Sequence, residues 1–406
     1  MNVDDDVTAA GMDEARLERI TEHFERSYME PGKLAGCQVL VSRHGHTAYE
    51  RNFGTLMVGD DRPVTDDSIW RIYSMTKPIT SVALMSLYER GKFRLTDPVH
   101  RYLPEWRDQR VGVVSGDGSL ELVEPDRPVQ MRDVLTHTAG LSYGWDPNHP
   151  VDKLYGETGI RGENVDLEGL GKLLGDLPLK FHPGTAWHYS LATDVCGRLV
   201  EVIGDRPFDA FLQEHIFDPL GMIDTGFTVP DDAVDRFTAN HGRRPDKSLT
   251  VSDHPDDSIY RKPRALLSGG GGLVSTMGDY ARFCEMLRRG GELDGHRVLG
   301  PETLRFMTRN HLPGGVAMSD IAVGTLGDVG FEGIGFGLGF ATTLDPVAAG
   351  VIGSAGDFWW GGAASTIFWV DPSQDLFVIF MVQLTPSGTF DFRSQLKALV
   401  YPAIVA

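Results

Sequence analysis

The pattern that most constrains the fold of this 406-residue chain is a pair of β-rich hairpins at its opposite ends. Residues 36–41 and 47–53 are rich in strand-forming side chains and flank the turn sequence of residues 43–46. Residues 367–370 and 376–382 flank a second turn sequence. Strands at both ends with helices between them predict one antiparallel sheet built from both ends of the chain, with a helical insertion.

The rest of the chain is mostly helix and loop by its pattern of apolar residues and helix-end signals. The predicted helices cover residues 12–28, 74–90, 129–136, 193–203, 276–287 and 391–402. The fold class that follows is α+β. We expect residues 1–70 and 325–406 to form a sheet domain and residues 71–324 a mostly helical domain. The two parts form one structural unit, with the active site in the groove between them.

The charge of the chain narrows the set of partners. Asp and Glu number 57 against 38 Lys and Arg, which gives a formal net charge of -19. So acidic a surface repels a phosphate backbone, and no basic cluster reverses this locally. We therefore expect a small-molecule partner and no nucleic acid, while the oligomeric state stays open.

Cysteine usage and the start of the chain bear on the compartment. Cys37, Cys196 and Cys284 are few and lie in apolar surroundings, which predicts buried free thiols and no disulfide framework. The first residues are acidic and lack the basic and apolar regions of a signal peptide. No apolar run is long enough to span a membrane. We expect a cytoplasmic protein without membrane association.

The motif with the clearest chemical meaning is S-x-x-K, formed by Ser74-Met75-Thr76-Lys77 at the start of a predicted helix. Residues three apart on a helix have Cβ atoms about 5–6 Å apart, so the Lys77 amine can reach the Ser74 hydroxyl. A serine hydroxyl becomes an effective nucleophile when a neighbouring base removes its proton. Burial and the positive end of a helix both favour the neutral, basic form of a lysine.

A second S-x-x-K copy, Ser394-Gln395-Leu396-Lys397, lies inside the predicted last helix. It falls on what should be the polar side of that helix, and no further motif follows it. We interpret it as a chance match whose lysine is solvated. The Ser74 copy differs because it opens its helix and two further motifs follow it.

Tyr189 and Trp360 lie in these two further motifs. Tyr189 follows a Pro-Gly turn and an aromatic run, and its phenol can act as a base only beside a cation such as Lys77. Trp360-Gly361-Gly362 lead into a predicted strand, where glycines allow a substrate to approach the backbone N–H groups closely. Taken alone, Tyr189 is better explained as a half-buried core tyrosine, and the glycines as an ordinary entry to a strand.

The three motifs together, in this order, resemble the β-lactamase-like superfamily of serine hydrolases, in which S-x-x-K is a signature. Residues 135–141, 269–276 and 335–340 are similar to further recurrent features of that superfamily. Within it the sequence most resembles family VIII carboxylesterases, which are similar to class C β-lactamases. The Tyr-x-Asn of class C enzymes is here Tyr189-Ser190-Leu191, and their Lys-Thr-Gly is here Trp360-Gly361-Gly362, the family VIII form.

The resemblance implies a β-lactamase/penicillin-binding-protein-like transpeptidase fold over nearly the whole chain. It implies that Ser74 is the nucleophile and that Lys77 and Tyr189 share the proton transfers. Backbone N–H groups of Ser74 and Ala363 would form the oxyanion hole, and Asp194 would help to orient the site. The residues expected to bind the substrate are Trp360, Gly361, Gly362 and Tyr143.

The other motif matches in the sequence lack the surroundings that a functional site of their kind needs. Gly140-Leu141-Ser142-Tyr143-Gly144 matches G-x-S-x-G, but a nucleophile elbow needs a strand before it and a helix after it, and here a helix precedes and a loop follows. Tyr143 and Trp145 are still expected to border the pocket. The glycine-rich segments 269–272 and 333–337 lack phosphate-loop and dinucleotide patterns, and no His-Glu-x-x-His occurs. We therefore expect no cofactor and no metal.

The function that follows is a serine carboxylesterase that hydrolyses short to medium acyl esters through an acyl-enzyme on Ser74. The lysine missing at Trp360 would suit a β-lactam carboxylate, so efficient β-lactam hydrolysis is not expected. The sequence leaves open a β-lactamase or D,D-peptidase, an acyltransferase that uses the same nucleophile, and a non-catalytic binding protein of the same fold.

Overall fold

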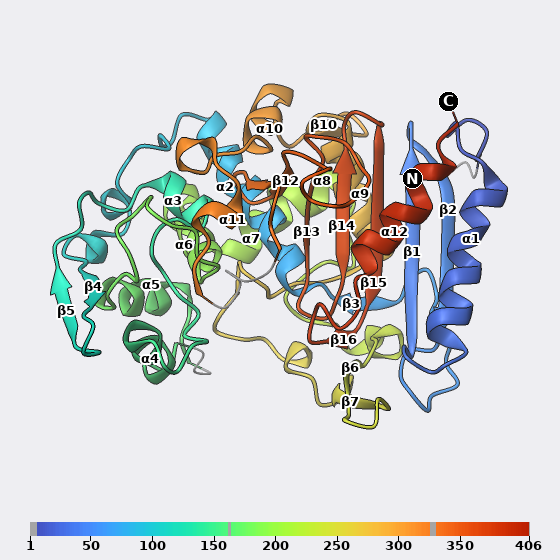
Figure 1. Cartoon of the computed structure of the whole chain (residues 1–406), viewed down its shortest axis with the longest axis horizontal. Coiled ribbons are helices and arrows are strands. Elements are labelled where there is room, and N and C mark those ends of the chain that lie inside the picture. The colour runs from blue at the N-terminus through green and yellow to red at the C-terminus, as the bar shows by residue number, and fades with distance from the viewer. Residues whose placement is uncertain (1–5, 161–163, 325–329, 406) are drawn as a thin grey trace.

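The computed structural model describes residues 6–160, 164–324 and 330–405. Its centre is a seven-stranded antiparallel sheet with the order β11-β12-β13-β14-β15-β1-β2 (Figure 1). The strands are β1 Gly36–Arg43, β2 His46–Gly54, β11 Ile334–Phe336, β12 Ala341–Thr343, β13 Phe358–Gly361, β14 Ile367–Asp371 and β15 Leu376–Val382.

The two ends of the chain meet inside this sheet, between β1 and β15. Their register runs from Cys37 opposite Val382 to Arg43 opposite Leu376. The first hairpin turns through His44 and Gly45, which both have positive φ, as a two-residue turn of type I′ requires. The predicted α+β fold, with one antiparallel sheet from both ends, is confirmed.

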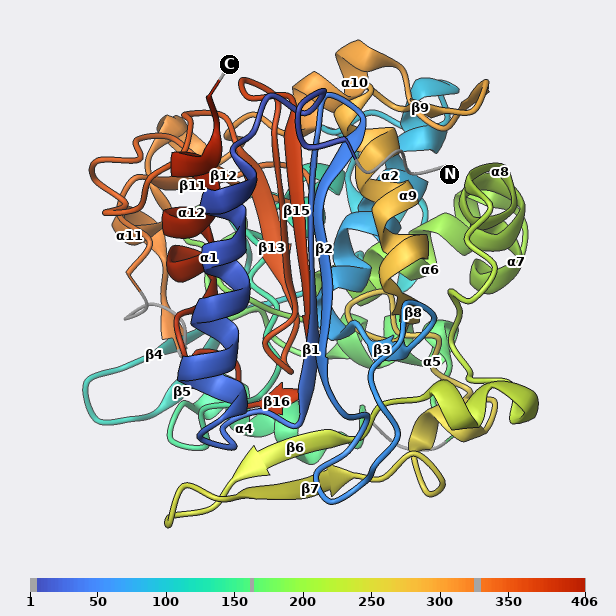
Figure 2. The ribbon, with the colours of Figure 1, turned by 90° about the vertical axis from the view of Figure 1, so that its right-hand side faces the viewer.

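Helices cover both faces of the sheet (Figure 2). α1 Glu14–Phe24, extended by a π-helical turn over Glu25–Met29, packs beside α12 Phe392–Val400 on one face. α9 Met277–Arg288 packs on β14 and β15 from the other face, where α2 Thr76–Glu89 also lies. α1 buries Leu17, Ile20 and Phe24 at helical spacing, so its apolar stripe joins the core.

The remaining helices and strands form a group of elements outside the main sheet. Its helices are α3 Met131–Leu135, α4 Pro150–Glu157, α5 Leu167–Asp176, α6 Ala192–Gly204, α7 Phe208–Leu212, α8 Asp218–Leu220, α10 Pro301–Met307 and α11 Met318–Ile321. Its short strands are β3 Ile69–Arg71, β4 Val111–Val114, β5 Leu120–Val123, β6 Asn240–Arg243, β7 Leu249–Asp253, β8 Val274–Thr276, β9 Glu292–Leu293, β10 His296–Arg297 and β16 Leu384–Thr385. Of these, β16 follows the last strand of the main sheet in the chain.

The predicted domain boundaries stay a prediction. The second one, between residues 324 and 325, lies at the edge of a segment outside the described residues. α9 belongs to the predicted helical part by sequence and packs on the sheet in space. None of the helices in the described ranges is long and apolar enough to cross a membrane.

The structure corrects the interpretation of Lys397. This lysine of the second S-x-x-K copy is not solvated, because its side chain is only 4% exposed and its Nζ donates to Asp357 Oδ2 at 2.5 Å. The pattern was misleading because both sides of α12 are covered, one by the sheet and one by α1. The three cysteines are buried free thiols as predicted, and burial raises the pKa of each.

Candidate active site

Ser74 lies on a tight turn between a short strand and a helix. β3 pairs with β8, and a 3-10 turn over Tyr73–Met75 follows before α2 begins at Thr76. The helix therefore starts two residues later than predicted, and Ser74 precedes it. Tyr73 has a φ of 42°, a left-handed conformation that costs a non-glycine residue about 1–3 kcal/mol. Such strain persists only where the surrounding structure holds it, and it is concentrated at functional sites.

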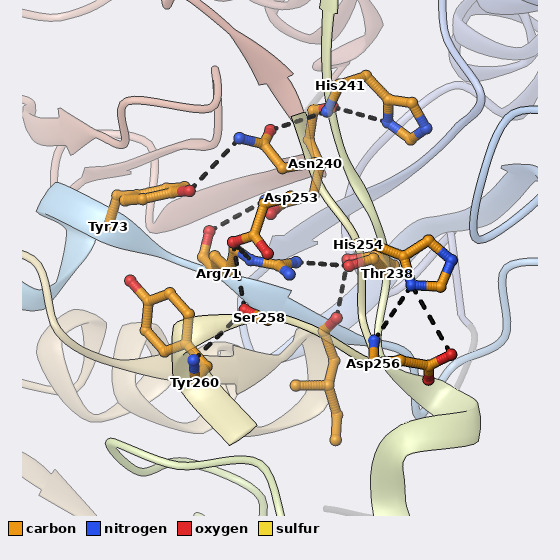
Figure 3. A network of polar contacts seen from close by, with 12 residues as sticks. Arg71, Tyr73, Thr238, Asn240, His241, Asp253, His254, Asp256, Ser258 and Tyr260 are labelled. Atoms are coloured by element: carbon orange, nitrogen blue, oxygen red, sulfur yellow. Dashed lines mark hydrogen bonds and ion pairs between the residues drawn. The ribbon is translucent and has the colours of Figure 1, made fainter. Parts of the chain in front are cut away.

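A buried polar network holds β3 directly before this turn (Figure 3). The Arg71 side chain is fully buried, and its Nε donates to Asp253 Oδ2 at 2.8 Å. Its Nη1 donates to the carbonyl oxygen of Thr238 at 2.5 Å. The Asn240 side chain donates to the Tyr73 hydroxyl at 3.4 Å. These contacts join the Ser74 turn to the β6–β7 region, which lies far away in sequence.

Ser74, Lys77 and Tyr189 meet at one point. Lys77 Nζ donates to Ser74 Oγ at 3.2 Å, and the Tyr189 hydroxyl donates to the same oxygen at 2.7 Å. The ammonium also lies 4.5 Å from the centre of the Tyr189 ring. Lys77 is buried, whereas Ser74 keeps partial exposure. The structure thus brings the three predicted catalytic side chains together, with the serine as the one that a substrate can reach.

A glycine-rich loop fixes the Lys77 amine. Nζ donates to the Gly270 carbonyl oxygen at 2.5 Å. Asp194, on α6, holds this loop, because its Oδ1 accepts from Ser268 Oγ at 2.5 Å and from Gly270 N at 3.1 Å. A Cβ atom on Gly270 would lie 2.5 Å from Asp194 Oδ2, so a larger residue would push this carboxylate away from the loop that it holds. The sequence pattern of these glycines excludes a phosphate loop but does not show that they position the lysine.

Aromatic rings surround the Tyr189 phenol. Trp360 Nε1 donates to the Tyr189 hydroxyl at 3.4 Å, and the two ring centres lie 5.5 Å apart. The Tyr143 ring lies 5.4 Å from that of Tyr189 and 5.7 Å from Lys77 Nζ. Trp145 stacks on Tyr143 at 4.5 Å. The predicted pocket residues Trp360 and Tyr143 therefore lie beside the candidate nucleophile.

In the Gly361-Gly362-Ala363 segment, Gly362 lies against the Ser74 turn, whereas Gly361 faces away from it. A Cβ atom on Gly362 would lie 2.7 Å from the Ile72 carbonyl oxygen, which places this glycine directly beside the turn. Ala363 follows on an exposed turn that the hydrogen bond from Ser365 N to Gly362 O closes at 3.0 Å. A side chain at Gly361 would instead meet Arg393 of α12, so this position faces the other side of the sheet from Trp360.

His137 lies behind Tyr189 and is not among the site residues predicted from the sequence. Its ring centre is 4.9 Å from that of Tyr189, and its side chain is fully enclosed. Burial, and next the Lys77 ammonium, hold the pKa of His137 well below its usual range, so its ring is neutral at pH 7. The signal was its position in the recurrent segment 135–141, but only the fold shows which ring it supports.

The serine of the G-x-S-x-G match is buried and bound in a structural cluster. Ser142 is 1% exposed and donates to the carboxylate of Asp152, which also forms an ion pair with Lys180. His188 Nε2 lies 3.3 Å from Ser142 Oγ. No substrate can reach this hydroxyl, and the antiparallel sheet is not that of an α/β-hydrolase. Among the residues that the structure describes, no group of His, Cys, Asp and Glu side chains could hold a metal ion.

Comparisons with known proteins place the chain in a family. A model of the family described as Beta-lactamase matches residues 21–401. Protein Rv1367c of Mycobacterium tuberculosis is 34% identical over 372 residues, with 90% of each chain covered. Esterase EstB of Burkholderia gladioli is 32% identical over 401 residues, with 94% of each covered.

A solved structure agrees with these matches. EstCE1, a hydrolase with promiscuous acyltransferase activity, superposes with a TM-score of 0.79 at 25% identity, over 97% of this chain and 99% of its own. The predicted β-lactamase/penicillin-binding-protein-like fold is thereby confirmed. Because the family model and the relatives span nearly the whole length, the chain belongs to the β-lactamase family and is a serine hydrolase.

Proposed function

We propose that this protein is a carboxylesterase that forms an acyl-enzyme on Ser74. The observation that carries the proposal is that a phenol and an amine, those of Tyr189 and Lys77, both contact the Ser74 hydroxyl oxygen. A serine hydroxyl in contact with two groups that can exchange protons is activated for attack on a carbonyl carbon once one of them takes its proton. EstB, which is named an esterase, supports this choice of reaction.

The proposed reaction has two halves. Ser74 Oγ forms a bond to the ester carbonyl carbon while its proton passes to the Tyr189–Lys77 pair. The bond from that carbon to the alcohol oxygen then breaks, and the alcohol leaves with the proton. In the second half, water attacks the acyl-enzyme, the pair takes a proton from it, and Ser74 regains a proton as the acid leaves. Backbone N–H groups of Ser74 and Ala363 stabilise the oxyanion in both halves.

The surroundings favour esters over β-lactams. A β-lactam antibiotic carries a carboxylate, which a lysine near the strand would bind. Here Trp360 occupies that position and donates only an indole N–H to Tyr189. Aromatic rings around Tyr189 favour a neutral, apolar substrate with a short to medium acyl group. The proposed substrate is therefore a small neutral ester. As expected from the sequence, the proposed compartment is the cytoplasm.

Transfer of the acyl group to an alcohol is a second candidate. It uses the same acyl-enzyme, with an alcohol in place of water in the second half. The printed description of EstCE1, a hydrolase with promiscuous acyltransferase activity, favours it. Product analysis with and without an added alcohol separates the two: a new ester in the presence of the alcohol marks transfer, and the free acid alone marks hydrolysis.

The test compares Ser74→Ala with Ser394→Ala, the serine of the second S-x-x-K copy. With a p-nitrophenyl ester of a short acid, we expect Ser74→Ala to lose activity by at least about a thousandfold and Ser394→Ala to keep it. A fluorophosphonate probe should label Ser74, and intact mass should show the acyl adduct there. Undiminished turnover by Ser74→Ala, or no labelled serine, contradicts the proposal. Nitrocefin turnover equal to ester turnover favours a β-lactamase.

A further inference from the structure

Trp145 is a large aromatic side chain that stays 45% exposed although it lies next to the candidate catalytic side chains. One face stacks on Tyr143, with ring centres 4.5 Å apart and planes inclined by 10°. Its ring centre lies 6.1 Å from that of Tyr189, whose hydroxyl contacts Ser74 Oγ. An exposed tryptophan this near a reacting group offers apolar area that a ligand can cover.

The loop that carries Trp145 is held in place by contacts of Gly144 with α4 and Ser142. Gly144 has a φ of 72°, and a Cβ atom there would lie 2.8 Å from Gly156 N and 3.0 Å from the Asp152 carbonyl oxygen. Gly144 N donates to Ser142 Oγ at 3.0 Å, and Ser142 donates to the buried Asp152 carboxylate. The close contacts and the hydrogen bond of Gly144 therefore restrict the backbone conformation of the turn that carries Trp145. A preformed aromatic surface binds a flat ring with little loss of conformational entropy.

The position of Tyr189 tells which half of an ester meets this surface. This step rests on the proposed function. If the Tyr189–Lys77 pair returns the proton to the leaving alcohol, that alcohol oxygen must lie on the Tyr189 side of Ser74. Tyr143 and Trp145 lie on the same side, beside the Tyr189 ring. The alcohol half of the substrate therefore extends over them.

We propose that the Tyr143–Trp145 stack binds a flat aromatic or fused-ring group on the alcohol half of the ester. The group is not anionic, because the Lys77 amine, 5.7 Å from the Tyr143 ring, already donates to Ser74 Oγ and to the Gly270 carbonyl oxygen. The ring stacks on the exposed face of Trp145, and the carbonyl carbon reaches Ser74. The stack thus selects substrates by their alcohol, while the acyl half occupies the opposite side of the serine.

The test uses three acyl esters with equally unactivated leaving groups. Naphthylethyl acetate carries the ring on the alcohol, ethyl naphthylacetate carries it on the acid, and butyl acetate has no ring. We expect Trp145→Ala to lower kcat/KM for naphthylethyl acetate by about fivefold to tenfold, mainly through KM, and to leave the other two esters within about twofold. Trp145→Phe should restore most of the loss. Phe306→Ala removes another exposed aromatic ring, on α10, and should change none of the three.

Binding separates this inference from the esterase proposal. Calorimetry measures the affinity of naphthylethanol for Ser74→Ala and for the double variant Ser74→Ala/Trp145→Ala, and needs no turnover. A fivefold to tenfold weaker affinity in the double variant supports the stack as the alcohol site, even if no ester is hydrolysed. Equal affinity in the two, an equal loss on all three esters, or a loss confined to ethyl naphthylacetate overturns it.

Discussion

The hydroxyl of Tyr189 donates a 2.7 Å hydrogen bond to Ser74 Oγ across 115 positions of sequence. The two residues come from different elements, since Ser74 precedes α2 and Tyr189 precedes α6. α2 and α6 pack directly on each other, which brings the two residues into contact. The phenol can therefore pass a proton to or from the serine without any rearrangement of the backbone.

Tyr189→Phe removes this hydroxyl and keeps the ring. We expect kcat on a p-nitrophenyl ester to fall by about 10²–10⁴-fold, the usual effect of losing a proton-transfer group, with little change in thermal stability. Tyr88→Phe, the same change at a half-buried tyrosine near the end of α2, is the control and should keep full activity. A Tyr189→Phe variant with more than about a tenth of the activity would show that Lys77 transfers the proton alone.

Asp194 positions the lysine through the loop, and its loss has two consequences. Asp194→Ala leaves the Ser268 hydroxyl and the Gly270 N–H without their acceptor, which should lower the free energy of unfolding by about 1–3 kcal/mol. It should also lower kcat by about tenfold to a hundredfold, because the Gly270 carbonyl no longer holds Lys77 in place. Urea unfolding and ester kinetics measure the two. Asp194→Asn keeps an acceptor oxygen and should lose less of both; an equal loss would point to the charge.

We expect the buried Asp357–Lys397 ion pair to contribute to stability and not to the reaction at Ser74. Lys397→Met leaves the buried Asp357 carboxylate unpaired and should destabilise the fold by about 3–5 kcal/mol. Replacing both, as Lys397→Met with Asp357→Leu, should recover most of that stability, with kcat per folded molecule unchanged. Arg16→Met breaks an exposed pair with Asp13 and should change the free energy of unfolding by at most about 1 kcal/mol. A double variant no more stable than the single one contradicts this account.

Acid should destabilise the protein through His137. The pKa of His137 is lowered in the folded state by burial and by Lys77, so the unfolded chain binds the proton more tightly. Its contribution to stability is complete above the unfolded pKa of about 6.5 and is lost as pH falls, by about 1.4 kcal/mol per pH unit. His137→Asn, which tolerates the φ of 58° at this position, should reduce the slope of the pH profile below pH 6.5, while buried histidines such as His188 keep part of it. The exposed His296→Gln should leave the slope as it is.

The sequence predicts β1, β2, β14 and β15 because these strands are rich in strand-forming side chains and flank clear turn sequences. It gives no bounds for β11, β12 and β13, which have only three or four residues. β15 has the predicted bounds, and β1, β2 and β14 extend them by at most two residues. β3 and β8 have three residues each, which is too short for a periodic pattern to be detected. These two strands pair with each other, and β3 leads into the Ser74 turn. The late start of α2 follows from the left-handed Tyr73, a tertiary effect that no local pattern encodes.

The candidate site is predictable to the extent that its chemistry is local. S-x-x-K places an amine next to a hydroxyl within one turn, so Ser74 and Lys77 could be named from their spacing. The contacts that hold Lys77 and Tyr189 come from Gly270, Asp194 and His137, which only the folded chain brings near. Lys397 has the same local spacing to its serine, and its burial depends on the sheet below it. Spacing therefore identifies candidates, and packing decides between them.

The pairing of β1 with β15 has a consequence for how the molecule is made. During synthesis β1 leaves the ribosome long before its neighbour β15, because most of the described chain lies between them. Until then the β1 edge stays open, and open edges promote association between chains. A nascent or truncated chain that ends before β15 already carries the Ser74 motif but lacks the sheet behind α9. We therefore expect reactivity at the serine to appear only after β15 has been made and has paired with β1.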